Sequence, residues 1–266
     1  MPRKLAIITG ASAGIGEVFA RRLAAEHDLL LVARRRDRLE GLAAELAGKT
    51  GARVDVLAAG LSEAAGREAV AGRIAAEPLL ALLVNNAGFG SRGLFWESEF
   101  EEADRMHRLH VTATLRLCHA ALRNMVPRDE GAIINVASVA AFVRRAGSSG
   151  YSATKSWMAV FTEGLHLELR SIRSGVSVQA LCPGFTYTEF HDVLGIKRDF
   201  ISGGWWMPAK DVVEASLQGL EKGKLFVVPG WRYKLLVALV RILPRGVLHF
   251  ALTKGPASLR RERKPK

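Results

Sequence analysis

The first sixteen residues constrain the fold of this chain most, because a short apolar run passes directly into a glycine-rich turn. The run is Leu5–Thr9, and the turn reads Gly10-Ala-Ser-Ala-Gly14-Ile-Gly16. Apolar residues at helical spacing follow between Val18 and Leu23, so we predict a strand, a turn and a helix that ends at His27. Glycines let a backbone come close to a pyrophosphate, whose charge is met by amide donors and by the positive end of the helix. The alternative is a flexible surface turn.

Seven short apolar runs alternate with helical stretches along the chain. They are Leu5–Thr9, Leu29–Ala33, Val54–Ala58, Leu80–Val84, Ala132–Val136, Val176–Leu181 and Leu225–Val228. Apolar strands separated by helices are typical of a parallel sheet covered on both faces. We therefore predict the α/β class, with a doubly wound parallel sheet of about seven strands. With 266 residues, of which 49% are hydrophobic, the chain can bury such a core as one domain.

Three polar residues indicate chemistry on a carbonyl group. Tyr151 and Lys155 are four residues apart in a helical stretch, and Ser138 lies thirteen residues before Tyr151, at a predicted strand end. Positions i and i+4 share one helix face, so the phenol and the ammonium are expected in the same cleft. An ammonium about 4 Å away, at an effective dielectric near 20, supplies the roughly 4 kcal/mol needed to lower the phenol pKa from about 10 to about 7. A solvated helix face is the alternative.

In order and spacing, five motifs resemble those of the classical short-chain dehydrogenase/reductase (SDR) family, over roughly residues 5–190. They are Thr9-Gly10…Gly14-Ile15-Gly16, Asn85-Asn86-Ala87-Gly88, Ser138, Tyr151…Lys155 and Pro183-Gly184. The resemblance implies a Rossmann fold, a nicotinamide cofactor, and hydride transfer between that cofactor and a carbonyl compound or an alcohol. It also implies a homodimer or a homotetramer.

The resemblance assigns roles to individual residues. In reduction, Tyr151 would be the general acid, Ser138 would orient the substrate oxygen, and Lys155 would lower the phenol pKa and bind the nicotinamide ribose. The expected cofactor-binding residues are Gly10, Ser12, Gly14, Ile15, Gly16, Arg34, Arg35, Asn86, Ala87, Gly88, Tyr151, Lys155, Pro183, Gly184, Thr186 and Thr188. The spacing of cysteines and histidines does not suit zinc, so no metal is expected.

Consecutive arginines after the second predicted strand indicate the form of the cofactor. Leu30–Ala33 is followed by Arg34, Arg35 and Arg36, with no acid to hold a ribose diol. An arginine at this place can pair with the 2′-phosphate of NADP, so we predict NADP(H), with Arg34 as the main contact and Arg35 next. The alternative is a solvated start of the next helix, and we adopt that interpretation for Arg36 and Arg38.

Two positions depart from the SDR pattern. Gly60 stands where many relatives have an aspartate against the adenine, and His110 stands where the family usually has an asparagine in the long helix after the fourth strand. In relatives that asparagine holds a water that links the active-site lysine to solvent. A histidine with a pKa near neutrality could serve this relay and make it pH-sensitive, so His110 is a candidate catalytic residue. A satisfied packing or helix-kink role is the alternative.

Substrate selection is expected in the loop-rich segment 185–206, a candidate lid in which Gly203 and Gly204 offer hinge freedom. Its aromatic side chains predict an apolar pocket for a hydrophobic carbonyl compound or secondary alcohol. The pocket residues expected here are Phe190, His191, Phe200, Trp205 and Trp206, completed by Phe142, Val143, Phe89 and Gly90. Ordinary packing of the loop onto the body is the alternative for each aromatic residue.

The composition shifts once, after about Trp231, where apolar and basic residues alternate before a basic tail. We predict an SDR domain at 1–230 and an amphipathic, basic C-terminal helical extension of the same domain at 231–266. Its longest apolar run, Leu235–Val240, is far shorter than the roughly 20 residues that span a bilayer. Three contacts stay open for the extension: the substrate pocket, another subunit, or an anionic membrane surface.

The formal net charge of +12 permits a binding function of another class. The basic clusters Arg34–Arg38 and Arg144-Arg145 could attract nucleic acid, but no reading module is present and a cofactor phosphate explains the first cluster. We therefore expect no nucleic-acid partner. An NADP-binding regulatory protein with weak or no turnover is the second alternative, and the departure at His110 is its best support.

Cysteine usage bears on the location of the protein. Cys118 and Cys182 are too few for a disulfide framework. A reduced, cytoplasmic compartment is therefore predicted, with membrane association through the C-terminal extension as an option.

Overall fold

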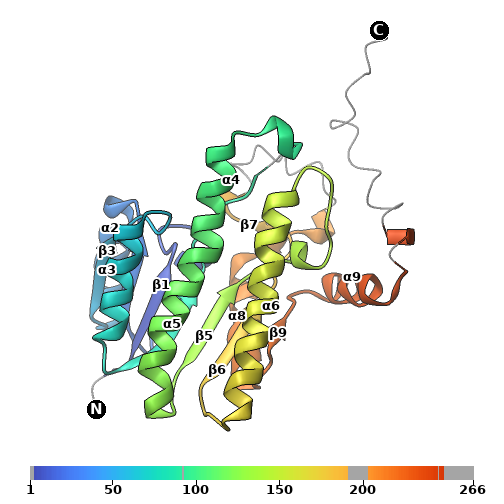
Figure 1. Ribbon diagram of the computed structural model, residues 1–266. Helices are drawn as coiled ribbons and strands as arrows, with labels where there is room; N and C mark the ends of the chain where they lie inside the picture. Colours follow the sequence, from blue (N-terminus) through green and yellow to red (C-terminus); the bar gives the residue numbers. More distant parts are fainter. Residues whose placement is uncertain (1–2, 92, 191–202, 245, 249–266) are drawn as a thin grey trace.

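The computed structural model describes residues 3–91, 93–190, 203–244 and 246–248. Its main sheet has seven strands in the order β3-β2-β1-β4-β5-β6-β9, and each neighbouring pair is parallel (Figure 1). The strands are β1 Leu5–Thr9, β2 Asp28–Ala33, β3 Val54–Ala58, β4 Leu80–Asn85, β5 Ala132–Val136, β6 Ser177–Leu181 and β9 Phe226–Val227. The predicted α/β sheet of about seven strands is confirmed.

Helices cover both faces of the sheet. They are α1 Gly14–Leu23, α2 Arg36–Thr50, α3 Ala64–Ala75, α4 Phe100–His107, α5 Ala113–Met125, α6 Ser149–Ser171, α8 Ala209–Glu221 and α9 Trp231–Ile242. Short 3₁₀ turns lie at η1 Phe95–Glu97, η3 Val126–Arg128, η4 Val139–Ala141 and η6 Gly203–Trp205, and a π-helical turn lies at η2 Arg108–Thr112.

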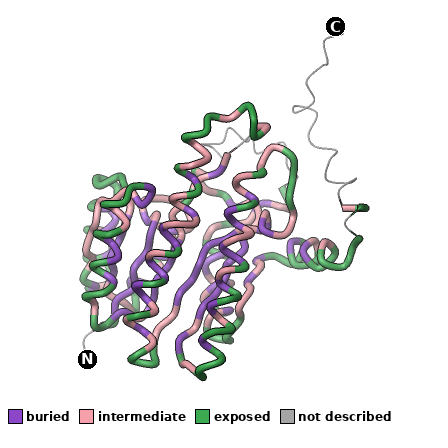
Figure 2. The backbone as a smooth tube through the Cα atoms, viewed as in Figure 1, coloured by how far each residue is buried: buried purple, intermediate pink, exposed green. Residues whose placement is uncertain are grey.

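The core lies in two layers because side chains alternate across each strand. In β1, Ile7 packs with residues of α3, α5 and α6, whereas Ile8 packs on the other face with residues of α1, α2 and α8. Both side chains are fully buried. Figure 2 shows the buried strands between helices whose outer sides are exposed. The sheet is therefore doubly wound, as predicted.

Several element boundaries differ from the prediction. The first helix ends at Leu23 instead of His27, because residues 24–26 form a turn before β2. The last strand has only two residues, Phe226–Val227. The single helix expected between the fourth and fifth strands is divided by the π-helical turn η2 into α4 and α5. A small parallel pair, β7 Thr186–Tyr187 and β8 Met207–Pro208, was not predicted.

Helix α9 begins the C-terminal extension, beside the sheet edge that ends with β9 (Figure 1). Tyr233 and Val237 on its inner side are buried, whereas Trp231, Leu235 and Leu239 on its other side are exposed. No helix in the described part of the chain is both long and apolar enough to cross a membrane. The predictions for His191, Phe200 and the basic tail lie outside the described residues.

Candidate active site

The sequence motifs meet at one edge of the sheet. Because the strands are parallel, the residues that follow β1, β4, β5 and β6 all lie at its carboxyl edge. These residues are the glycine turn, Asn86–Gly88, Ser138 and Pro183-Gly184. The strand order reverses between β1 and β4, and open α/β sheets bind ligands at such a reversal.

The glycine turn forms a cradle at the start of α1. Gly10 and Gly14 have φ of +66° and +60°, a conformation that L side chains rarely adopt. The turn is fixed to β4 because the Asn86 side chain donates to the carbonyl oxygen of Thr9 at 2.9 Å, and the Asn86 amide donates to the Thr9 hydroxyl at 2.9 Å. The N-cap of α1 is Ala13, whose methyl side chain cannot accept a hydrogen bond from the first backbone amides of the helix. An anion can therefore accept from them.

Tyr151 and Lys155 lie on the first turns of α6, and Ser138 lies at the N-cap of η4. The Lys155 ammonium nitrogen is 5.9 Å from the centroid of the Tyr151 ring and donates to the carbonyl oxygen of Val136 at 2.7 Å. The Ser138 hydroxyl oxygen accepts from the amide of Ala140 at 3.1 Å. Lys155 is only 4% exposed. The three predicted residues are thus brought together in a largely desolvated site.

Burial dominates the titration of this pair. It raises the pKa of Tyr151 to about 12, against a smaller lowering by the hydrogen bond with Ser138. It lowers the pKa of Lys155 to about 7, because the buried ammonium loses its hydration. The expectation that Lys155 lowers the phenol pKa to about 7 is therefore wrong for this arrangement of the site. The ammonium donates to a backbone carbonyl, and its own charge is disfavoured by burial.

His110 is fully buried at the centre of η2, with a partner for each ring nitrogen. The amide of Phe89 donates to Nε2 at 3.2 Å, and Nδ1 lies 2.9 Å from the Thr154 hydroxyl oxygen. Since that hydroxyl donates to the carbonyl of Tyr151 at 2.9 Å, Nδ1 is the donor in its contact with Thr154. The ring is therefore neutral, with its proton on Nδ1.

The expectation of a pKa near neutrality for His110 is corrected. Burial lowers the pKa of His110 well below its usual value, and the charge of Lys155 lowers it further. A second proton on Nε2 would face the amide hydrogen of Phe89. In this arrangement neither ring nitrogen is left for a pH-sensitive relay, and the hydrogen bonds match the packing and helix-kink alternative. The ring also lies edge-on to Tyr151, with centroids 5.9 Å apart.

The three arginines that directly follow β2 have different surroundings. Arg34 is exposed at the strand end, and its Cγ and Cδ lie 3.8 Å from where a Cβ on Gly60 would stand, so Gly60 leaves room beside it. Arg36 pairs with Glu40 on its own helix at 3.4 Å, as expected for a solvated helix start. Arg35 donates to the Ser12 hydroxyl oxygen at 3.0 and 3.2 Å.

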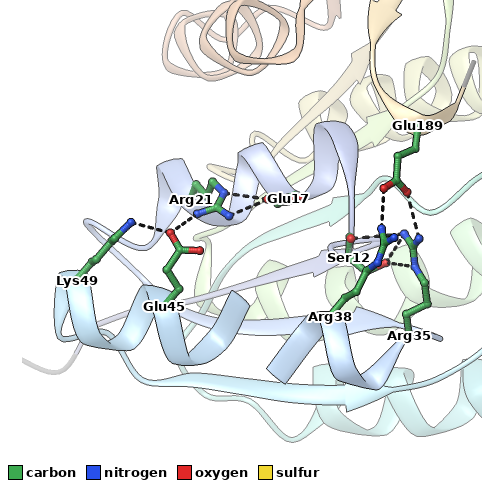
Figure 3. A network of polar contacts seen from close by, with 8 residues as sticks. All are labelled: Ser12, Glu17, Arg21, Arg35, Arg38, Glu45, Lys49 and Glu189. Carbon is green, nitrogen blue, oxygen red and sulfur yellow. Dashed lines mark hydrogen bonds and ion pairs between the residues drawn. The ribbon is translucent and has the colours of Figure 1, made fainter. Parts of the chain in front are cut away.

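The acidic residue that binds this cluster was missed by the sequence analysis. Glu189 pairs with Arg35 at 3.1 Å and with Arg38 at 2.7 Å (Figure 3). Both arginines lower the pKa of Glu189, and Arg38 has the larger effect. Arg38 therefore contacts a distant segment, which differs from the solvated helix start expected for it. One available signal was that Glu189 is the only charged residue between Pro183 and Phe190.

Several aromatic residues that were predicted for the substrate pocket pack together with α9. Phe142, Val143, Phe185 and Trp205 pack around the buried Val139, Tyr233 and Val237. The Tyr233 hydroxyl accepts from the amide of Phe185 at 2.9 Å and donates to the carbonyl of Trp205 at 2.7 Å. The inner side of α9 thus packs on the predicted pocket segment, and Tyr233 is a second residue that the sequence analysis missed.

Comparison with known proteins decides the family. Residues 4–198 match the family model described as short chain dehydrogenase. The chain belongs to the short-chain dehydrogenase family. The SDR resemblance found in the motifs is therefore confirmed, and the chain is an oxidoreductase of that family. It is similar to an uncharacterized oxidoreductase of Myxococcus xanthus (strain DK1622), with 30% identity over 246 residues, which covers 92% of this chain and 94% of that protein.

Two solved SDR structures are similar over nearly the whole chain. A short-chain dehydrogenase from Sphingobium yanoikuyae in complex with NADPH has a TM-score of 0.82 and 35% identity, over 97% of this chain and 98% of that one. The bulky-bulky ketone specific alcohol dehydrogenase from Comamonas testosteroni has a TM-score of 0.78 and 28% identity, over 100% of this chain and 98% of that one.

Within the ranges that the structure describes, no group of three or more His, Cys, Asp or Glu side chains is placed to hold a metal ion.

Proposed function

We propose that this SDR is an NADP(H)-dependent oxidoreductase that transfers a hydride between the nicotinamide and a hydrophobic carbonyl compound or secondary alcohol. The observation that carries the proposal is the meeting of Ser138, Tyr151 and Lys155 at the sheet edge that also holds the glycine turn. The phenol, the ammonium and the hydroxyl are the groups that a carbonyl reduction needs beside a hydride source.

The residues present fit a dinucleotide. The cradle of Gly10, Gly14 and Gly16 with the free amides of α1 would hold the pyrophosphate, and Ile15 lies within it. The remaining residues proposed to line the cofactor are Ser12, Arg34, Arg35, Asn86, Ala87, Gly88, Tyr151, Lys155, Pro183, Gly184, Thr186 and Thr188. When bound, the nicotinamide supplies or accepts the hydride.

In reduction, Tyr151 donates its proton to the substrate oxygen. Its raised pKa of about 12 keeps the phenol protonated at neutral pH, so the proton is present for donation. Ser138 donates a hydrogen bond to the same oxygen and orients it. Lys155 binds the ribose hydroxyls beside the nicotinamide. We assign His110 a positioning role: its bond to Thr154 connects the π-helical turn to α6 one turn from Tyr151.

The choice of NADP(H) is supported by the exposed basic residues at the end of β2. Arg34 stands at the strand end and Arg35 is anchored on Ser12. None of the first three residues after the strand, Arg34 to Arg36, is an acid that could bind a ribose diol. The NADPH complex of the Sphingobium relative is consistent with this choice.

The cofactor choice is tested by comparing Kd values for NADPH and NADH. Arg34→Gln and Arg35→Gln are expected to weaken NADPH binding about tenfold and to leave NADH binding nearly unchanged. Arg36→Gln is the matched control, because Arg36 pairs only with Glu40 among its described ion pairs. Equal losses for NADPH and NADH in the first two variants would contradict NADP(H) selection.

A bulky apolar substrate is supported by the aromatic walls of the site. Phe190 approaches Tyr151 with ring centroids 6.0 Å apart. Phe142, Phe185 and Trp205 pack in one apolar cluster around Val139, the residue after Ser138. The bulky-ketone specificity of the Comamonas relative points the same way. Small charged substrates would leave this surface unfilled.

The assembly and location are also proposals. We propose a single domain at 1–230 extended by 231–266, a homodimer or homotetramer, and a cytoplasmic location, since both cysteines are free and buried. The exposed apolar residues of α9 are available for a subunit or for peripheral contact with a membrane. They are Trp231, Leu235, Leu239 and Ile242.

The catalytic proposal is tested by NADPH consumption against a panel of apolar aldehydes, ketones and steroid-like carbonyl compounds. Loss of turnover in Tyr151→Phe, with NADPH binding retained, would support it. NADPH binding without reduction of any carbonyl compound, and without oxidation of any alcohol by NADP, would favour the regulatory alternative. A nucleic-acid function has less support, because the chain contains no known nucleic-acid reading module.

A further inference from the structure

Glu189 binds Arg35 and Arg38, two of the arginines that follow β2 at the proposed adenosine end of the cofactor site. Its Oε2 lies 3.1 Å from Arg35 Nη1, and its Oε1 lies 2.7 Å from Arg38 Nη1 (Figure 3). Ser12 accepts from the opposite side of the Arg35 guanidinium, at Nε and Nη2. In this arrangement, a carboxylate oxygen therefore lies on each of two guanidinium groups, which are the donors that a phosphate would use.

These ion pairs are open to exchange with another anion. The side chains of Arg35, Arg38 and Glu189 are 43%, 45% and 49% exposed, and pairs of such exposure contribute little to stability. A phosphate monoester carries more negative charge than a carboxylate at neutral pH and has three acceptor oxygens. It can therefore replace Glu189 on the arginines, at the cost of breaking both pairs.

We propose that Glu189 is a cofactor-specificity residue that competes with the 2′-phosphate of NADP(H) for Arg35 and Arg38. The inference rests on the proposed use of NADP(H). A 2′-phosphorylated cofactor must break the Glu189 ion pairs in order to bind, and this cost lowers its affinity. A cofactor with an unmodified ribose does not need those arginines and is unaffected, so Glu189 narrows the preference that the arginines create.

The segment that carries Glu189 contacts both ends of the site. Thr188, the preceding residue, lies against the glycine turn, since its Cβ would be 3.1 Å from a Cβ on Gly14. Phe190, the following residue, lies beside the Tyr151 ring. Release of Glu189 therefore takes place between the phosphate-binding turn and the general acid.

Titration calorimetry on the cofactor-free protein tests the competition without turnover. The probes are adenosine 2′,5′-bisphosphate and 5′-AMP, which differ by the 2′-phosphate. Glu189→Gln is expected to bind the bisphosphate about 3- to 10-fold more tightly than the native chain, with 5′-AMP unchanged. Glu40→Gln is the matched control, because it removes the same charge from a side chain that pairs with Arg36.

The proposed competition is overturned if Glu189→Gln binds the bisphosphate no more tightly than the native chain does. Equal binding would mean that Glu189 has no effect on the phosphate, and weaker binding would mean that Glu189 positions the arginines for it. Equal tightening in Glu40→Gln would also overturn it, since the effect would be one of net charge. Arg35→Gln separates this failure from failure of NADP(H) use. If the native chain does not prefer the bisphosphate and Arg35→Gln does not weaken its binding, both proposals are overturned. Thermal unfolding of each variant confirms that it is folded.

Discussion

At Tyr151, burial and a neighbouring hydroxyl act on the phenol pKa in opposite directions, and burial is the larger effect. The spacing of Tyr151 and Lys155 predicted their shared helix face, because i and i+4 positions always share one. It did not predict the titration, because burial and the Lys155 bond to Val136 depend on residues of other strands. Glu189 was missed for the same reason: its partners Arg35 and Arg38 are about 150 positions away in the sequence.

His110 gives a prediction on the pH dependence of stability. Its folded-state pKa lies well below 6.5, so the unfolded chain binds a proton that the folded chain does not. The free energy of unfolding should therefore fall as pH drops below about 6.5, by up to about 1.4 kcal/mol per pH unit from this group.

Urea unfolding at pH 7.5 and 5.5 measures this contribution. In His110→Asn, the difference between the free energies of unfolding at the two pH values should be smaller than in the native protein. In His119→Asn, which changes an exposed position of α5, that difference should be the same as in the native protein. An unchanged difference in His110→Asn would show that His110 titrates normally in the folded protein. Each variant is compared with the native protein because His27, whose pKa burial also lowers, contributes to the pH dependence of the free energy of unfolding in all of them.

Among the elements, those with long apolar runs were predicted well. β1, β3 and β5 have the predicted bounds, because short and mainly apolar runs between helical stretches have few other ways to fold. The π-helical turn η2 was not predicted, since its residues, Arg108–Thr112, include no glycine or proline to mark an irregularity in the helix. β7 and β8 were missed because each has two residues, and their pairing depends on contacts between distant segments.

Tyr233 gives a prediction for α9. Tyr233→Phe removes a hydroxyl that accepts from Phe185 and donates to Trp205, so both backbone groups lose a partner. The free energy of unfolding should fall by about 1–3 kcal/mol, and the KM for bulky ketones should rise several-fold.

Trp231→Phe changes an exposed aromatic residue of the same helix and serves as the control. Urea unfolding and steady-state kinetics measure the two effects. If Tyr233→Phe and Trp231→Phe give the same stability and the same KM, α9 has no part in shaping the pocket.

For the whole molecule, the net charge of +12 and the arginines at one end of the site act together on anionic ligands. The long-range field attracts NADPH and NADH alike and is screened by salt. In the proposed function, the partly exposed arginines would contact the 2′-phosphate, which only NADPH carries. Composition could predict the general attraction, but only the fold brings Arg35, Arg38 and Ser12 to one place.

Salt dependence separates these two contributions. Between 50 and 500 mM NaCl, the Kd of NADPH should rise about threefold to tenfold more than the Kd of NADH, because the 2′-phosphate makes additional screened contacts. Arg35→Gln should reduce that excess, and Arg36→Gln should not. Identical salt dependence for the two cofactors in the native protein would mean that the arginines do not bind the 2′-phosphate.

The central claim, hydride transfer to a carbonyl carbon with Tyr151 as the proton donor, is tested most directly by deuteride transfer. The protein is incubated with a bulky apolar ketone and with NADPH in which both hydrogens on nicotinamide C4 are replaced by deuterium, and the alcohol product is examined by mass spectrometry. We predict an alcohol with one deuterium on the carbinol carbon, with a yield at least about 100-fold lower in Tyr151→Phe. Alcohol without deuterium, or equal yields from native protein and Tyr151→Phe, would contradict the proposed function.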